Sequence, residues 1–209
     1  LIGRVFWMRV DGKGTHLNSM QAKNALQGVI ARGVQDLVVD LERCPMMDST
    51  FLGMLTGAAL SVKKAAHPGT LSVLNANQRN VQLLTSLGLN HILDLDVDGK
   101  LWASERVRAA EALKICDETE PCSREVQTQH ILDAHQTLSG ISSENECRFR
   151  DVIELVVGLV GSTRPVDHQR LVAGNPDQPG AELRIPTKAC GVPPDFIHCI
   201  HHHFLCARV

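Results

Sequence analysis

The sequence contains no tyrosine, and aromatic residues make up only 3% of its 209 residues. Proteins that bind single strands of nucleic acid without sequence preference stack the bases on aromatic side chains, so this composition offers little for such a platform. A positive field is also missing, because the formal net charge is -2 and the isoelectric point is near 6.6. Nucleic acids are bound largely through phosphate contacts from lysine and arginine. We therefore expect no nucleic acid among the partners.

Long uninterrupted apolar segments are lacking as well. Glu154 interrupts the apolar stretch 152–160, which is also shorter than the roughly 20 residues that a membrane-spanning helix needs. The first ten residues begin with Leu1 and predict a strand, not a signal peptide, so the chain is expected to start inside a longer gene product. Seven cysteines, an odd number without framework spacing, fit reduced thiols. We expect a cytoplasmic protein that makes no membrane contact.

Residues 1–115 predict one α/β domain. Apolar strand segments alternate with segments of helical periodicity, and connections of a few residues join them. The expected order is a strand at 4–10, a helix at 17–30, a strand at 37–41, a helix at 51–62, a strand at 71–74, a helix at 81–87, a strand at 92–93 and a closing helix at 102–113. Such alternation predicts a mixed or parallel sheet with helices packed on it.

Residues 116–157 predict a C-terminal helical extension made of two helices. One apolar stripe at helical spacing runs over 126–138, and a second runs over 149–156. Ser143, with Glu146 three residues later, fits a capping box at the start of the second helix. We expect the pair to dock on the domain or on a partner.

Residues 158–209 are rich in proline and show little periodicity of either kind, so they predict an irregular, disordered tail. The segment 198–206 contains four histidines and two cysteines, which are possible metal ligands. Zinc sites space their ligand pairs by fixed gaps, and three consecutive histidines cannot point all their rings at one ion. We therefore expect neither a metal site nor a cofactor in this chain.

The segment that follows the strand at 37–41 carries the most specific pattern in the sequence. It reads Met47-Asp48-Ser49-Thr50-Phe51-Leu52-Gly53. It resembles the signature of anti-sigma factor antagonists in the STAS family, in which a strand leads through Asp-Ser-Thr/Ser-Gly-Leu-Gly into a helix. The resemblance covers most of 4–113 in element order and spacing. It implies a STAS-like fold for residues 1–115, with Ser49 as the phosphoacceptor because it directly follows Asp48.

Physical reasoning on the same residues is consistent with that role. Asp48 or Ser49 at the start of a helix can accept hydrogen bonds from the free backbone N–H groups of the first turn. The hydroxyl of Ser49 is then expected to be exposed at the junction of loop and helix. The simpler interpretation is that the two residues only cap the helix. The residues predicted to contact a partner are Thr15, His16, Asp48, Ser49, Thr50, Phe51, Leu52 and Gly53.

The family resemblance implies a phosphorylation-switched binding module and not an enzyme. The unphosphorylated form would capture an anti-sigma factor, which is also a serine kinase of the histidine-kinase-like ATPase fold, and so release a sigma factor. Phosphorylation at Ser49 would block binding, and a serine phosphatase would reset the switch. The chain has no G-x-x-x-x-G-K-[ST] loop, so it is not expected to phosphorylate itself.

Several alternatives stay open. Phe51 stands where the family commonly has glycine, and it either contacts the partner or packs inward. A STAS domain without sigma control would be a subunit of a signalling scaffold or of a lipid or anion transport system. In an enzyme, Ser49 would be the nucleophile with His16 or His67 as its base, but no G-x-S-x-G turn surrounds the serine.

Overall fold

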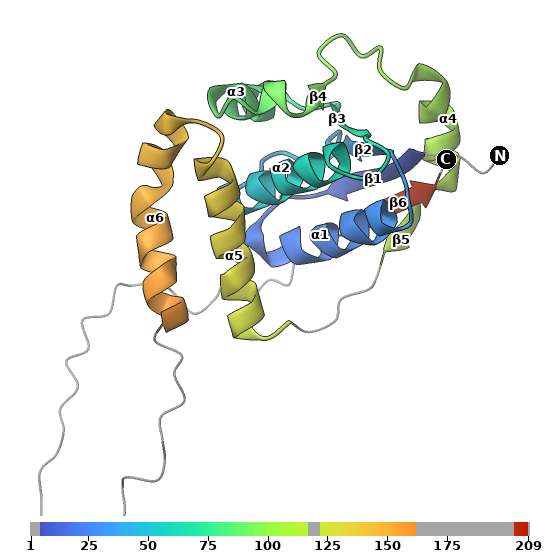
Figure 1. Ribbon diagram of the computed structural model, residues 1–209. Coiled ribbons are helices and arrows are strands. Elements are labelled where there is room, and N and C mark those ends of the chain that lie inside the picture. The colour runs from blue at the N-terminus through green and yellow to red at the C-terminus, as the bar shows by residue number, and fades with distance from the viewer. Residues whose placement is uncertain (1–4, 117–121, 162–202, 209) are drawn as a thin grey trace, which may run out of the picture. The chain divides into compact units, whose positions relative to one another are not determined.

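The computed structural model describes residues 5–116, 122–161 and 203–208. The elements in chain order are β1 (Val5–Asp11), α1 (His16–Ala31), β2 (Asp36–Asp40), α2 (Ser49–Lys63), β3 (Thr70–Leu74), α3 (Gln78–Ser86), the 3-10 helix η1 (Leu89–His91), β4 (Asp94–Leu95), α4 (Ala103–Ala112), β5 (Lys114–Cys116), α5 (Arg124–Ser139), α6 (Ser143–Gly161) and β6 (His203–Arg208) (Figure 1). The predicted α/β alternation up to residue 113 is confirmed, with boundaries shifted by one or two residues at most elements.

The strands form one mixed sheet in the order β4-β3-β2-β1-β6-β5. Strands β1 to β4 are parallel neighbours, whereas β6 runs antiparallel to both β1 and β5. The mixed sheet agrees with the prediction. Strand β6 lies within the segment for which the sequence predicts no regular structure. It supplies hydrogen-bond partners to the free edge of β1, a long-range pairing that local periodicity does not report.

The central strands are buried on both faces of the sheet. Along β1, Phe6 and Met8 enter the larger core beneath α1 and α2, while Trp7 enters a smaller cluster on the opposite face. Strand β2 divides in the same way, because Val39 faces the larger core and Val38 the smaller one. Such a strand needs apolar residues at every position. The continuous apolar run of β2 is consistent with its burial on both faces.

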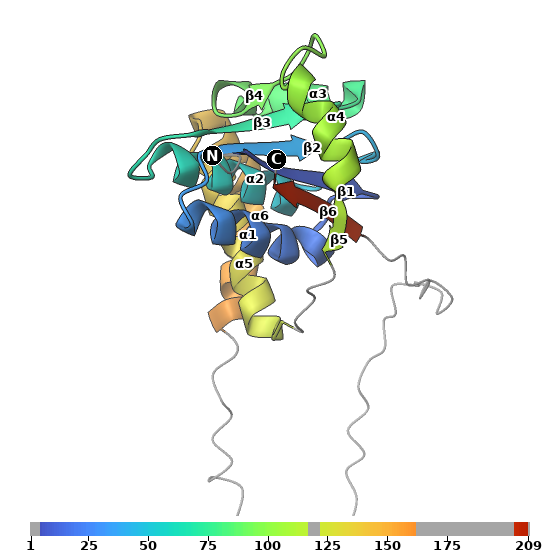
Figure 2. The ribbon, with the colours of Figure 1, turned by 90° about the vertical axis from the view of Figure 1, so that its right-hand side faces the viewer.

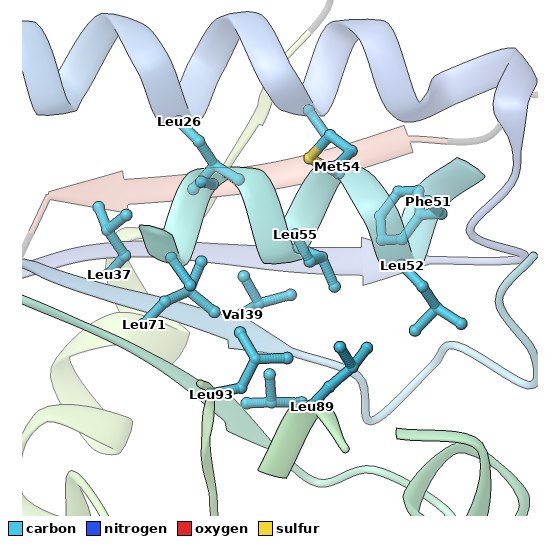
Figure 3. Close-up of a cluster of buried hydrophobic side chains, with 14 of the residues drawn as sticks. Leu26, Leu37, Val39, Phe51, Leu52, Met54, Leu55, Leu71, Leu89 and Leu93 are labelled. Carbon is cyan, nitrogen blue, oxygen red and sulfur yellow. The ribbon is translucent and has the colours of Figure 1, made fainter. Parts of the chain in front are cut away.

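The larger core lies between the sheet and helix α2. Figure 3 shows Leu37, Val39 and Leu71 of the strands in one cluster with Leu55 of α2, with Phe51 near the start of that helix. Helix α4 covers the opposite face, where the Trp102 indole N–H donates to the Ser72 hydroxyl oxygen at 3.0 Å. These two layers fix the start of α2 relative to the ends of β1 and β2.

Helices α5 and α6 pack on the domain and on each other. Helix α5 contacts α1 and α2, and α6 lies on the far side of α5 (Figures 1 and 2). Leu138 of α5 and Phe149 of α6 belong to the same core as the sheet. The buried Asn145 side chain of α6 donates to the Leu87 carbonyl oxygen at 3.0 Å. Of the two predicted docking modes, the structure therefore contains the intramolecular one.

The start of α6 differs from the predicted capping box by one residue. The Asn145 N–H donates to the Ser142 hydroxyl oxygen at 3.2 Å, and the Glu146 N–H donates to the Ser142 carbonyl oxygen at 2.9 Å. Ser142 is thus the N-cap, and Ser143 is already the first helical residue. The prediction that Ser143 caps the helix is wrong, because two adjacent serines offer the same capping chemistry.

The extension and the tail do not divide at residue 157. Helix α6 continues to Gly161, and residues 203–208 form β6. Residues 162–202, which include the histidines at 198, 201 and 202, lie outside the described residues. Within the described ranges, no group of three or more His, Cys, Asp or Glu residues could hold a metal ion. In those same ranges no helix is both long and apolar enough to cross a bilayer.

Candidate functional site

Asp48 joins the start of α1 to the start of α2. Its Oδ1 accepts the Phe51 N–H at 2.9 Å, which is the N-cap bond of α2, and its Oδ2 accepts the His16 N–H at 2.8 Å. The Asp48 N–H in turn donates to the Gly14 carbonyl oxygen at 2.9 Å. A carboxylate at two helix N-termini also complements both helix dipoles. Asp48 therefore holds the loop after β1 against the loop after β2.

Ser49 follows this cap as the first residue of α2, as predicted, but it is half-buried and not exposed as expected, because α5 covers one side of it. Its Oγ lies 2.8 Å from Nε2 of His135, a residue of α5 that is 86 positions away in the sequence. The other ring nitrogen of His135, Nδ1, lies 2.8 Å from the Ile131 carbonyl oxygen. A carbonyl only accepts, so Nδ1 carries the proton of the neutral ring and Nε2 is an acceptor. The Ser49 hydroxyl therefore donates to His135.

His135 is buried and is held from two sides. Its ring stands edge-on to Phe149 of α6, with centroids 5.7 Å apart and an interplanar angle of 63°. The enzyme alternative named His16 or His67 as the base for Ser49, whereas in the described part of the chain the histidine that bonds Ser49 is His135. Instead, Nδ1 of His16 lies 3.5 Å from Oδ2 of Asp48. Nothing in the local pattern around position 135 distinguishes it from the other histidines.

The residues predicted to contact a partner fall into two groups. His16 is exposed, and Thr15, Asp48 and Ser49 are half-buried around it. The other four are buried, namely Thr50, Phe51, Leu52 and Gly53. The first group can be touched from solvent as the chain stands. The second group supports the start of α2 from within.

Phe51 packs inward, which was one of its two predicted arrangements. The side chain is fully buried and lies over Gly14 of the loop after β1. A Cβ added to Gly14 would lie 2.9 Å from the Phe51 ring, so this position leaves no room for a side chain. The larger residue at position 51 is thus accommodated by the absence of a side chain at position 14.

Helix α5 rests directly on the backbone of α2 at Gly53. A Cβ added to Gly53 would lie 2.2 Å from the Ala134 carbonyl oxygen, whereas one added to Gly57, one turn later, has no neighbour within 4 Å. Contacts below 3.0 Å cannot be accommodated without movement of one of the two backbones. Gly53 is therefore the residue that permits α5 to approach the start of α2.

A second histidine of α5 makes a similar contact with α1. Nε2 of His130 lies 2.8 Å from Oγ of Ser19, and both residues are buried. Ser19 Oγ also donates to the His16 carbonyl oxygen at 3.2 Å, so it accepts a hydrogen bond from His130. Nδ1 of His130 has no hydrogen-bond partner among the described residues.

His130 is neutral at physiological pH. Burial lowers the pKa of the His130 imidazole to about 4, and the positive charge of Lys23 acts in the same direction. Lys23 is also in an ion pair with Asp133 of α5, with 3.7 Å between Nζ and Oδ2. Helix α5 is thus attached to α1 by a neutral hydrogen bond and one ion pair.

Comparison with known proteins identifies the domain that carries Ser49. The family profile described as "Mlab, STAS domain" matches residues 3–95. Residues 3–95 are therefore a STAS domain. Helices α5 and α6 lie beyond the matched residues, so the bond between Ser49 and His135 connects the STAS domain to the helical extension.

Solved structures with a similar fold include three related to anti-sigma factor antagonists. The anti-sigma factor antagonist SpoIIAA in its unphosphorylated form is 21% identical, with a TM-score of 0.41, over 52% of this chain and 93% of that one. The phosphorylated form of SpoIIAA from Bacillus is also 21% identical, with a TM-score of 0.40, over 52% and 95%. A Thermotoga maritima protein assigned as an anti-sigma factor antagonist is 18% identical, with a TM-score of 0.44, over 52% and 91%. No curated protein matches the sequence.

Proposed function

We propose that this STAS domain is a protein-binding module whose affinity for its partner is switched by phosphorylation of Ser49. The observation that carries the proposal is the position of the Ser49 hydroxyl: half-buried, in the first turn of α2, directly after the N-cap Asp48. In this proposal the unphosphorylated form binds an anti-sigma factor that is itself a serine kinase of the histidine-kinase-like ATPase fold. Binding releases a sigma factor, and a serine phosphatase restores the unphosphorylated form.

The accessible part of the proposed contact surface is small and polar. It consists of Thr15, His16, Asp48 and Ser49, which the two loops hold together through the hydrogen bonds of Asp48. The buried group at positions 50–53 contributes by fixing the direction of α2. A partner that covers the accessible group must desolvate the Ser49 side chain and the Asp48 carboxylate together.

Phosphorylation is expected to act at the interface more than on folding. A phosphoserine carries a charge of about -1.5 to -2, and the dipole at a helix N-terminus stabilises it by roughly 0.3 to 1 kcal/mol in the free and the bound protein alike. Beside Asp48 in an interface, two unit charges ~4 Å apart repel by about 4 kcal/mol at an effective dielectric of ~20. Half of that energy weakens binding roughly thirtyfold.

The test is to incubate the full chain with ATP and candidate anti-sigma factors of the ATPase fold, and to map phosphate by mass spectrometry. We expect one phosphate, on Ser49, and none on the buried neighbour Thr50. In binding assays, Ser49→Asp should lose the complex and Ser49→Ala should keep it. The matched control is Ser104→Asp, on the exposed start of α4, which should bind like the wild type. Unchanged binding of Ser49→Asp rejects the proposal.

Two other outcomes distinguish other functions of the same domain. Recovery of transporter or scaffold subunits from cells, in place of a kinase, favours a STAS subunit without sigma control. Hydrolysis of simple esters that is lost in Ser49→Ala favours an enzyme, for which the bond between Ser49 and His135 is the supporting contact. Against an enzyme, the group that orients His135 is the Ile131 carbonyl and not a carboxylate, which leaves an imidazolium less stabilised than in a hydrolase triad.

A further inference from the structure

Helix α5 covers the residue that the proposed switch modifies. It contacts the STAS domain at Ser49 through His135, at Gly53 through the Ala134 backbone, and at Ser19 through His130. We infer that α5 is a lid over the phosphoacceptor, and that a seated lid and a phosphate on Ser49 exclude one another. This inference rests on the proposed function only in taking Ser49 as the regulated residue.

A docked α5 and a phosphate on Ser49 exclude one another for two reasons, the space around the Ser49 Oγ and the hydrogen that this oxygen carries. Oγ and Nε2 of His135 are already at hydrogen-bond distance, 2.8 Å, so a phosphorus atom with three oxygens cannot be inserted between them. A phosphoserine Oγ has no hydrogen, so it cannot donate to the Nε2 lone pair as the hydroxyl does. A protonated His135 would attract the phosphate, but its ring would still have to retreat to make room.

The lid cannot make that room by a local adjustment. One turn of α5 carries both His135 and Ala134, and the Ala134 carbonyl lies against the backbone of Gly53. The buried ring of His135 is also confined by Phe149 and by its bond to the Ile131 carbonyl. Close-packed interiors transmit such displacements and do not absorb them. Movement of His135 away from Ser49 therefore lifts this turn of α5 off α2.

The lid also competes with any protein that approaches Ser49. A kinase needs an in-line path to the Ser49 Oγ, and a partner needs the surface next to that oxygen. The docked α5 blocks one side of the path and covers one side of the surface. When only an open fraction of molecules is competent, the apparent dissociation constant is the intrinsic constant divided by that fraction. The docking of α5 thus lowers the affinity of the unphosphorylated form and the rate of its modification. Phosphate on Ser49 holds the lid open.

The test measures docking of α5 without any partner. Full-length protein with phosphoserine incorporated at position 49 is compared with the wild type by hydrogen exchange and mass spectrometry of residues 124–139. We expect the α5 amides to exchange about tenfold faster or more, which corresponds to at least ~1.4 kcal/mol of lost docking. Phosphoserine at Ser104 is the control, because it adds the same charge to an exposed helix start on α4. It should leave α5 unchanged.

A second pair of variants tests the contact between α5 and the backbone of α2 at Gly53. Gly53→Ala and Gly57→Ala make the same substitution in α2 and gain the same helix propensity, but only the former clashes with Ala134. Gly53→Ala should speed exchange in α5 as phosphoserine at position 49 does, and Gly57→Ala should not. If the α5 amides of the phosphoserine-49 protein exchange at the wild-type rate, the inference that α5 is a lid is wrong. If α5 opens but no kinase phosphorylates Ser49, the lid stands and the proposed switch fails.

Discussion

Two hydrogen bonds between α5 and the STAS domain, one on α1 and one on α2, are alike in distance and opposite in direction. Each joins a serine to Nε2 of a histidine at 2.8 Å. In the pair on α1, His130 donates and Ser19 accepts, because the Ser19 hydroxyl is already donated to the His16 carbonyl oxygen. In the pair on α2, Ser49 donates and His135 accepts, because the Ile131 carbonyl fixes the proton of the ring on Nδ1.

This difference in direction separates a structural contact from one that chemistry can break. Ser19 and His130 are both buried. The protons of the Ser19 hydroxyl and of the His130 ring stay in place at neutral pH. Ser49 is half-buried, and its bond exists only while Oγ carries a hydrogen. A phosphate on Ser49, as proposed, would therefore break the α2 contact and spare the α1 contact. The same helix is anchored at one end and releasable at the other.

The largest expected effect comes from removing an apolar side chain that anchors α5 in the core. Leu138 of α5 is fully buried in the core, so Leu138→Ala should lower the free energy of unfolding by about 2–5 kcal/mol and loosen both hydrogen bonds together. Urea denaturation followed by circular dichroism measures the loss. Leu155→Ala on α6 is the control, since that side chain is 67% exposed, and it should change stability by less than ~0.5 kcal/mol. Equal losses in the two variants would mean that α5 is not docked.

Acid should destabilise the folded protein through His130, because a buried imidazole resists taking up a proton. The pKa of His130 is about 4 in the folded protein, below its ordinary value of about 6.5, so the unfolded chain binds a proton first as the pH falls. The stabilisation is complete above pH 6.5 and is lost as the pH falls toward 4. Between pH 6.5 and 5 we expect the free energy of unfolding to fall by about 1–2 kcal/mol.

A variant comparison assigns that pH dependence to His130. His130→Gln keeps an N–H donor for Ser19 but does not titrate, so its stability should vary less between pH 6.5 and 5 than that of the wild type. His91→Gln, at an exposed position of η1, is the control and should retain the wild-type slope. The charged groups that act on His130, namely Lys23, Asp133 and Asp48, are unchanged in both variants. If His130→Gln keeps the full slope, other groups cause it.

The fold and half of the site follow from local sequence. The apolar run of β2 and the Asp48 cap before α2 depend on neighbouring residues only, so periodicity and capping chemistry predict them. The position of Ser49 at the start of α2 follows for the same reason. Burial of Phe51 was one of two predicted arrangements, and the decision between them depended on Gly14, 37 positions earlier in the chain.

The other half of the site depends on long-range packing. His135 is recognisable as a neighbour of Ser49 only after α5 is placed on α2. The periodicity within 124–139 does not indicate which face of the domain the helix covers. The glycine at position 53 was the available signal, because a glycine inside a helix lowers helix propensity and often has a packing reason, although Gly57 of the same helix has no neighbour within 4 Å. Strand β6 was missed for the same physical reason, since its hydrogen-bond partners lie in β1 and β5.

Truncation of the two serines tests the direction of each bond, and the smallest effect is expected from Ser49→Ala. Ser19→Ala leaves the His130 N–H buried without an acceptor, which costs about 1–3 kcal/mol of unfolding free energy. Ser49→Ala leaves the His135 lone pair without a donor, but water can approach it through the half-buried position 49, so a cost of about 0.5–1 kcal/mol is expected. Urea denaturation of both variants at pH 7 measures the two costs side by side. A cost for Ser49→Ala equal to or above that of Ser19→Ala would contradict the assignment of His130 as the buried donor. It would also contradict the explanation of why a phosphate on Ser49 releases only one end of α5.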